Sequence, residues 1–187
     1  MPKYRKLSGL PGAGPLPVSF PGGKISHSEG FVVEFETNDG DRWFGNFGGG
    51  LSIYSALFTH PDGSRVVVIA GGACYIVDPE SRESEDSFSG CITAAYEMPE
   101  LNMLILQTPI SFIALSSEGI SWETERIAEN GFRDLQFEES KLIGEAWFPV
   151  DGPWHKFELD LHSGKFTGGS SMRGQDAPDE KPWWKFW

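Results

Sequence analysis

The chain has 187 residues, of which 39% are hydrophobic and 22% are charged, a balance that excludes an intrinsically disordered protein. Its formal net charge of −12 argues against nucleic-acid binding, because an acidic surface repels the phosphate backbone. The two cysteines, Cys74 and Cys91, are too few for a disulfide scaffold, and both lie in apolar, strand-like segments.

The N-terminal region lacks the pattern of a signal peptide. Lys3, Arg5 and Lys6 are followed by a stretch that prolines interrupt, and no apolar segment follows them. No run approaches the ~18 apolar residues that a membrane-spanning helix requires. These patterns predict a cytoplasmic protein without a membrane span.

Residues 1–28 are rich in proline and glycine, which predicts an extended arm. Leucines and Phe20 are spread through this arm, so we expect it to pack along the domain that follows. That domain is predicted to span residues 29–168 and to consist of β-repeats. Residues 169–187 are predicted to form a flexible tail with a Trp-rich end.

A β-hairpin is predicted at the start of the domain. From Phe31 to Glu36 apolar and polar residues alternate with the period of a strand, and residues 42–47 form a second such segment. Asp39 and Gly40 between the two segments are typical of a hairpin turn.

One unit of about 40 residues then occurs three times, over residues 53–84, 92–124 and, more loosely, 132–169. In the first two copies a strand ends in an aromatic residue, Phe58 or Tyr96, and a proline turn follows at Pro61 or Pro99. Two short apolar strands and a polar turn complete each copy. No stretch of ten residues has the 3.6-residue period of a helix. An all-β protein is therefore predicted.

Units of this length with three to four short strands are typical of β-propeller blades. The segment Cys-Tyr-Ile-Val-Asp-Pro-Glu-Ser at residues 74–81 resembles the strand and turn of YVTN- and quinoprotein-type propeller repeats, and so does His-Ser-Gly-Lys at residues 162–165. The chain as a whole also resembles an uncharacterised bacterial family, which implies no activity. The resemblance implies a small or incomplete propeller-like array of antiparallel, three- to four-stranded units; a β-sandwich is the alternative.

The number of units raises the question of closure. One hairpin and three units amount to about three and a half blades, whereas closed propellers have at least four. Either the first hairpin is a reduced fourth blade, or the array is open and its strand edges need cover from the arm, the tail or a second subunit.

Motifs for catalysis, metal binding and cofactor binding are scarce. The four histidines are not spaced as metal ligands in an HxH or HExxH pattern. No GxSxG motif or P-loop occurs, and the glycine-rich stretch at residues 45–50 does not open a helix. We expect no catalytic residues, no metal and no cofactor.

Two carboxylate pairs keep a hydrolase open as an alternative. Glu34 with Glu36, and Glu158 with Asp160, share a strand face, and a glycosidase uses one protonated and one ionised carboxyl group. Both pairs alternate with apolar residues, which a solvent-facing strand surface also produces. A structural role is the favoured interpretation.

The tail is the most unusual segment, because four of its last five residues are aromatic. They are Trp183, Trp184, Phe186 and Trp187. We predict that they dock onto the chain's own domain or onto a partner or second subunit, since Trp dominates interface hot spots. A membrane interface is a third possibility, although only Lys181 and Lys185 would attract anionic lipid.

These patterns predict a non-enzymatic protein-interaction module with a protein partner or a second copy as its ligand. Within that class, the acidic charge suits an immunity-type protein that binds a basic partner. The alternative is a small-ligand or glycan binder that uses aromatic residues as a stacking platform. The candidate residues for that platform are Trp43, Trp147, Trp154 and His155, with Trp122 as a further tryptophan.

Overall fold

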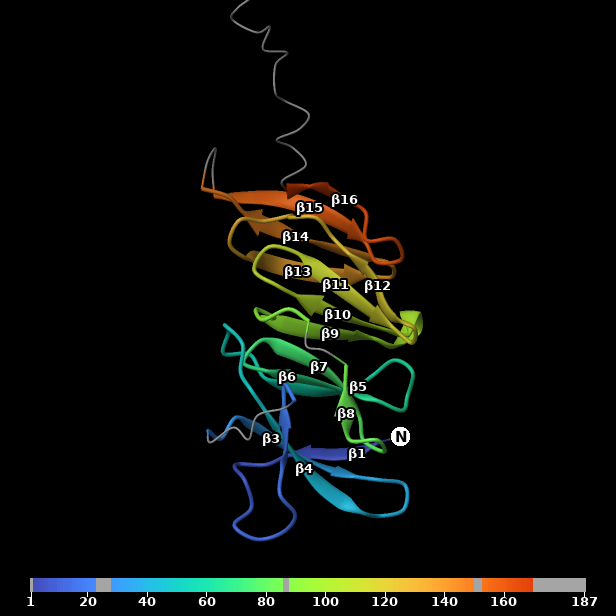
Figure 1. Ribbon diagram of the computed structural model, residues 1–187. Helices are drawn as coiled ribbons and strands as arrows, with labels where there is room; N and C mark the ends of the chain where they lie inside the picture. The colour runs from blue at the N-terminus through green and yellow to red at the C-terminus, as the bar shows by residue number, and fades with distance from the viewer. Residues whose placement is uncertain (1, 23–27, 86–87, 150–152, 170–187) are drawn as a thin grey trace, which may run out of the picture. The chain divides into compact units, whose positions relative to one another are not determined.

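The computed structural model describes residues 2–22, 28–85, 88–149 and 153–169 (Figure 1). These residues form sixteen strands in four four-stranded sheets and one short 3-10 turn, η1 (Pro99–Leu101). The predicted fold class, an all-β array of propeller-like four-stranded units, is confirmed. The described residues include no helix long and apolar enough to cross a bilayer.

The first sheet has the strand order β1-β3-β4-β2. Its strands are β1 (Lys3–Lys6), β2 (Val18–Phe20), β3 (Phe31–Glu36) and β4 (Arg42–Phe47). The predicted hairpin is present as β3 and β4, with Gly40 at a φ of 85° in the turn. Strand β1 pairs antiparallel with β3, and β2 pairs parallel with β4. The arm thus supplies both edge strands and makes the hairpin the centre of a complete fourth unit.

In the other three sheets the strand order follows the chain, as in the blade of a propeller. The second sheet contains β5 (Ala56–Thr59), β6 (Val66–Ala70), β7 (Ala73–Asp78) and β8 (Glu83–Ser84). The third contains β9 (Ala94–Met98), β10 (Met103–Gln107), β11 (Phe112–Ser116) and β12 (Gly119–Glu123). The fourth contains β13 (Phe132–Glu138), β14 (Lys141–Trp147), β15 (Trp154–Asp160) and β16 (Phe166–Gly168).

The chain divides into two compact units, one of residues Met1–Thr108 and Ile113–Ser121, the other of Pro109–Phe112 and Trp122–Trp187. In the first unit the second sheet is buried on both faces. Val66, Val68 and Tyr75 lie in one core cluster with aromatic residues of the first sheet, whereas Val67 and Ile69 lie in another with residues of the third. Burial on both faces explains why β6 is a continuous apolar run.

In the second unit the fourth sheet buries only one face. Leu142, Ala146 and Phe157 are fully or almost fully buried, and the Phe157 ring lies 5.4 Å from that of Phe132. Strand β13 carries a bulge between Arg133 and Gln136. The opposite face consists of alternate residues of β13, β14 and β15, which are mostly polar, charged or aromatic, with Ile143 as an aliphatic member.

Candidate functional site

The opposite face of the fourth sheet, which we call the open face, brings together two of the predicted site residues. Trp147 on β14 and Trp154 on β15 are directly paired across the two strands. The neighbouring rows add Arg133 opposite Glu145, and Glu145 opposite Lys156. Because paired residues of adjacent strands project to the same side, these five side chains share one surface.

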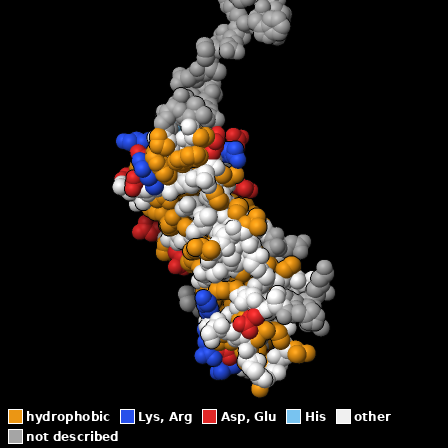
Figure 2. Space-filling view, turned by 90° about the vertical axis from the view of Figure 1, so that its left-hand side faces the viewer, with side chains coloured by type: hydrophobic (Ala, Val, Ile, Leu, Met, Phe, Trp, Pro, Cys, Tyr) orange, Lys and Arg blue, Asp and Glu red, His pale blue; other side chains and the backbone are white. Residues whose placement is uncertain are grey.

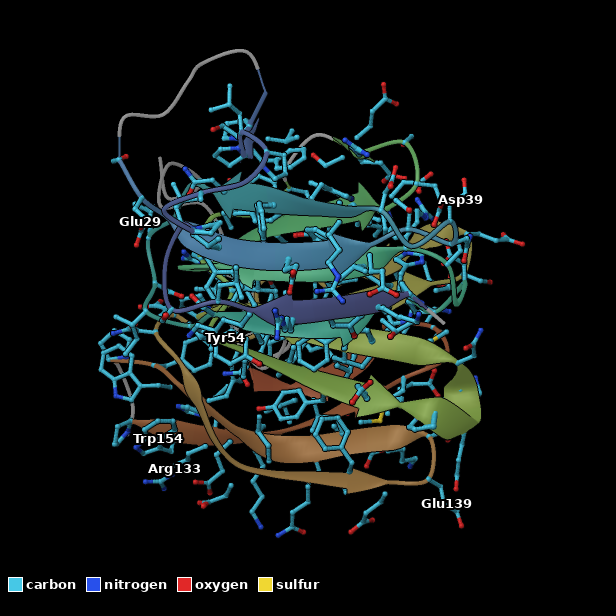
Figure 3. The ribbon with its side chains drawn as sticks, turned by 90° about the horizontal axis from the view of Figure 1, so that it is seen from below. Glu29, Asp39, Tyr54, Arg133, Glu139 and Trp154 are labelled. Atoms are coloured by element: carbon cyan, nitrogen blue, oxygen red, sulfur yellow. The ribbon has the colours of Figure 1, made fainter. Side chains whose placement is uncertain are left out.

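Arg133 contacts residues of both other strands on this surface. Its guanidinium carbon lies 4.3 Å from the centroid of the Trp154 ring (Figure 3). Its Nε donates to Glu145 Oε2 at 2.7 Å, and its Nη2 lies 2.6 Å from the same oxygen. Since β14 lies between β13 and β15, Arg133 crosses one strand to reach Trp154. The ion pair with Glu145 and the cation–π contact together orient the guanidinium.

Both tryptophans of the open face are half-buried. Part of each indole is packed and part faces solvent, which gives the face an aromatic surface next to a fixed positive charge. Such an arrangement suits a ligand that offers both apolar area and a hydrogen-bond acceptor.

His155 does not belong to this platform, contrary to the prediction from the sequence. It follows Trp154 directly in β15, and successive residues of a strand point to opposite faces. Its ring instead meets the ring of Phe148 edge-on, at a centroid distance of 5.4 Å. The sequence does not reveal the register of this strand, and it is the register that directs His155 to the face opposite Trp154.

Trp43 is also excluded from the platform. Its side chain is 1% exposed, stacks on Phe35 at a centroid distance of 4.4 Å, and donates from Nε1 to the Pro79 carbonyl at 2.9 Å. A ring in the core of the first unit offers no face to a ligand. Trp122, in the second unit, donates its Nε1 hydrogen to the Leu161 carbonyl. The predicted docking residues of the tail, Trp183, Trp184, Phe186 and Trp187, lie outside the described residues.

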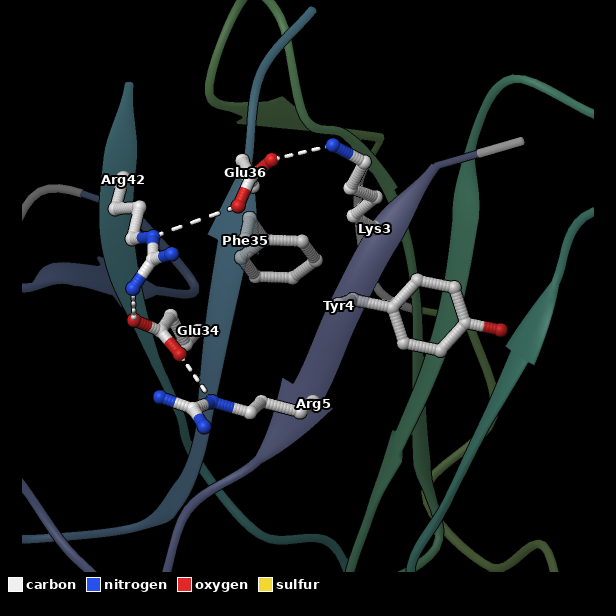
Figure 4. A pocket seen from close by; sticks show the side chains of 7 residues that line it. All are labelled: Lys3, Tyr4, Arg5, Glu34, Phe35, Glu36 and Arg42. Carbon is white, nitrogen blue, oxygen red and sulfur yellow. Dashed lines mark hydrogen bonds and ion pairs between the residues drawn. The ribbon is translucent and has the colours of Figure 1, made fainter. Parts of the chain in front are cut away.

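The first carboxylate pair is engaged in ion pairs on the outer face of the first sheet (Figure 4). Glu36 lies 2.5 Å from Lys3 Nζ and 3.4 Å from Arg42, and Glu34 contacts Arg5 and Arg42. Together with Tyr4 and Phe35 these side chains line a pocket of about 230 Å³. The hydrogen bond and charge of Lys3 lower the pKa of Glu36, whereas a general acid requires a raised pKa.

The second pair has structural partners as well. Glu158 contacts Lys141 on the neighbouring strand. Asp160 accepts hydrogen bonds from the Ser163 hydroxyl and amide, which shape the turn between β15 and β16 and lower the pKa of Asp160. The contacts of both carboxylates account for their presence without a catalytic role.

Among the described residues, no group of three or more His, Cys, Asp or Glu side chains could hold a metal ion. Cys74 and Cys91 are not joined in a disulfide. Burial raises the pKa of the Cys74 thiol strongly, so this cysteine is a packing residue rather than a nucleophile. Of the side chains fully buried in the described chain, only His60 has a polar atom, Nε2, without a hydrogen-bond partner.

A second surface escaped the sequence analysis altogether. Leu51 and Ile53, in the loop that joins the first two sheets, are 91% and 102% exposed. Figure 2 shows hydrophobic side chains over much of one face of the molecule, with acidic and basic side chains among them. The sequence gives no signal for this exposure, because an apolar residue at every second position there resembles the start of a half-buried strand.

No family model matches the chain, and no curated protein matches it.

Proposed function

We propose that this chain is a non-enzymatic protein-interaction module and that a protein partner binds its open face. One observation carries the proposal: Glu145 and Trp154 fix the guanidinium of Arg133 beside a second, half-buried tryptophan. Trp and Arg are the residues most enriched in interface hot spots. A preorganised arginine loses less conformational entropy on binding than a free one, which favours its use in recognition.

A protein partner suits this face better than a glycan does. A sugar ring binds by stacking on an uncovered aromatic face, and Arg133 already covers part of the Trp154 ring. Trp147, half-buried on the same face, is the other tryptophan of the predicted platform on the open face. Glycan binding is therefore the second candidate function.

The charge of the chain favours a basic partner. A net charge of −12 attracts a basic protein at long range and speeds its association. In more specific terms, we propose that the chain is an immunity-type protein that binds and neutralises a basic toxin. The same acidic field would slow the approach of an acidic partner.

The test is a quantitative affinity capture from the cells in which the chain occurs, with the wild-type chain, Trp154→Ala and the control Ser117→Ala as baits. Ser117 is exposed in a turn of the first unit. We expect a protein that wild type and control recover equally and that Trp154→Ala recovers at least tenfold less, since hot-spot truncation costs about 2 kcal/mol or more. Equal recovery of every captured protein by all three baits would refute the proposed site.

A further inference from the structure

We propose that the first unit carries a self-association surface, at which Leu51 and Ile53 of one chain dock onto the same region of a second copy. This surface consists of residues 48–55, 70–73 and 88–93, which we call the uncharged end. It lies in a different unit from the open face, and the proposal stands without a partner there.

The loop that carries Leu51 and Ile53 is firmly attached to the unit. The amides of Leu51 and Ser52 donate to the carbonyls of Gly90 and Gly71, at 2.6 and 2.9 Å. The Ser52 hydroxyl donates to the Ile92 carbonyl at 2.5 Å and accepts from the Tyr54 amide. A backbone bonded at this many points holds the two aliphatic side chains in solvent by its conformation.

Glycines allow the three segments to approach this closely. A Cβ atom on Gly50 would lie 2.4 Å from the Gly90 carbonyl oxygen, and one on Gly72 would lie 2.7 Å from the Ser52 hydroxyl. Because no side chain separates the backbones, the loop packs directly on the turn between β6 and β7. Its apolar side chains consequently have no room beneath the loop and point outward.

Exposure of two large aliphatic side chains to water is unfavourable, and a symmetric contact would bury four of them, Leu51 and Ile53 of both chains. Association also costs translational, rotational and side-chain freedom, which offsets much of this gain. A contact of this kind suits a weak, concentration-dependent dimer rather than an obligate one.

The charge distribution of the first unit indicates which partner fits. The uncharged end contains eighteen residues without a single Asp, Glu, Lys or Arg. Four acidic residues, Asp39, Asp62, Asp78 and Glu80, lie in turns at the other end of the strands. Figure 3 labels Tyr54 and Asp39 at these two opposite ends, and it labels Glu29, which precedes β3, on the same side as Tyr54. The five residues of β6 alone separate the ends by roughly 16 Å, about twice the screening length at physiological salt.

A two-fold dimer brings the same surface of both chains into contact. An uncharged surface suits such a contact, because no like charges then face one another across it. Two chains of charge −12 repel one another in most orientations. Contact through the uncharged ends keeps the acidic turns of both copies apart. Ala70, Gly72, Ala73 and Ile92 are buried, so the other fourteen residues of this end can line a contact. That number is below the 20–30 residues a side of a typical interface, which indicates a modest affinity.

Sedimentation equilibrium tests the proposal, with Leu51→Ser/Ile53→Ser as the variant and Leu16→Ser as the matched control. Leu16 is also 91% exposed but lies in the arm, outside the uncharged end. Between about 10 μM and about 1 mM, a range suited to weak association, wild type and control should rise from the mass of one chain towards that of two. The double variant should remain at the mass of one chain, with an unchanged thermal unfolding midpoint as evidence of folding.

Two outcomes would overturn the proposal. One is a wild-type chain that stays monomeric at the highest concentration, and the other is a double variant that associates as wild type does. Flotation with uncharged phosphatidylcholine vesicles tests the competing explanation that Leu51 and Ile53 bind a lipid surface. Monomeric wild type that floats with the vesicles, and a double variant that does not, would assign the two side chains to a lipid surface instead.

Discussion

Arg133 on β13 and Trp154 on β15 are in contact across the intervening strand β14, with the guanidinium carbon 4.3 Å from the ring centroid. For two side chains on strands separated by a third to meet, the residue between them on the middle strand must either be small or contact one of them. Here Glu145 on β14 assists, because it accepts from the Arg133 side chain. The contact therefore links three strands across the open face.

This contact should appear as a coupling energy in a double-mutant cycle. We expect the free energies of unfolding of Arg133→Ala and Trp154→Ala to be non-additive by about 0.5–1 kcal/mol, as for an exposed cation–π pair. Urea denaturation of the wild type, the two single variants and the double variant measures this value. Effects that add within about 0.3 kcal/mol would show that the ring and the guanidinium do not interact.

Two adjacent glycines provide a matched test of the packing under the exposed loop. Gly50→Ala should lower the free energy of unfolding by about 1–3 kcal/mol, because its Cβ atom would meet three backbone atoms that cannot move aside easily. Gly49→Ala should change it by less than about 0.5 kcal/mol, since nothing lies within 4 Å of its Cβ position. Equal effects of the two substitutions in urea denaturation would contradict the described loop.

His60 should make stability depend on pH. Burial lowers the pKa of His60, and Asp62, whose Oδ2 lies 3.0 Å from Nδ1, opposes this only in part. The unfolded chain thus binds a proton below its own pKa of about 6.5, where the native chain does not. The free energy of unfolding should be constant above about pH 7 and fall on acidification, by at most about 1.4 kcal/mol per pH unit.

The variant His60→Gln should flatten this dependence between about pH 7 and pH 5, whereas His162→Gln, at an exposed position, should retain it. Asp62 contributes only in more acidic solution. Its burial is outweighed by hydrogen bonds from the Arg65 and Ser64 amides, which hold its pKa well below the usual range. Its contribution is therefore lost below about pH 4. An unchanged slope in His60→Gln would mean that His60 is not the titrating group.

Trp43 should behave as a core residue. Trp43→Phe leaves the buried Pro79 carbonyl without its donor and reduces the packed volume, so we expect a loss of about 1–3 kcal/mol. Trp154→Phe, on the open face, should cost less than about 1 kcal/mol, because it keeps an aromatic ring beneath Arg133. Thermal or urea unfolding of both variants checks the order, and the reverse order would contradict the burial of Trp43.

The strands of the first hairpin could be predicted from the sequence because their signals are local. Alternation from Phe31 to Glu36 and the Asp39-Gly40 turn depend only on neighbouring residues. The arm strands gave no such signal. Strand β1 is mostly charged, and β2 has three residues and pairs in parallel with a distant strand. Their formation depends on contacts far apart in the chain.

The candidate site was predictable only in part, since composition identifies tryptophans but not the side of the sheet they face. Trp147 and Trp154 share the open face because β15 begins at Trp154 and pairs in that register. His155 is the next residue of β15 and therefore projects to the opposite face in the same register. Trp43 lies in a strand whose burial reflects packing of the first sheet on the second. The contacts of Arg133 with Glu145 and Trp154 likewise depend on the register of β13 and β15 against β14.

The central claim is that the open face binds a protein, and site-specific photocrosslinking tests it most directly. A p-benzoyl-phenylalanine at Lys156, which is exposed on that face, should yield a crosslinked species heavier than the chain on irradiation in its own cells. The same residue at Ser117 should yield none, and Trp154→Ala should abolish the Lys156 product. An open face that gives no protein crosslink, or one that Trp154→Ala leaves intact, would contradict the account.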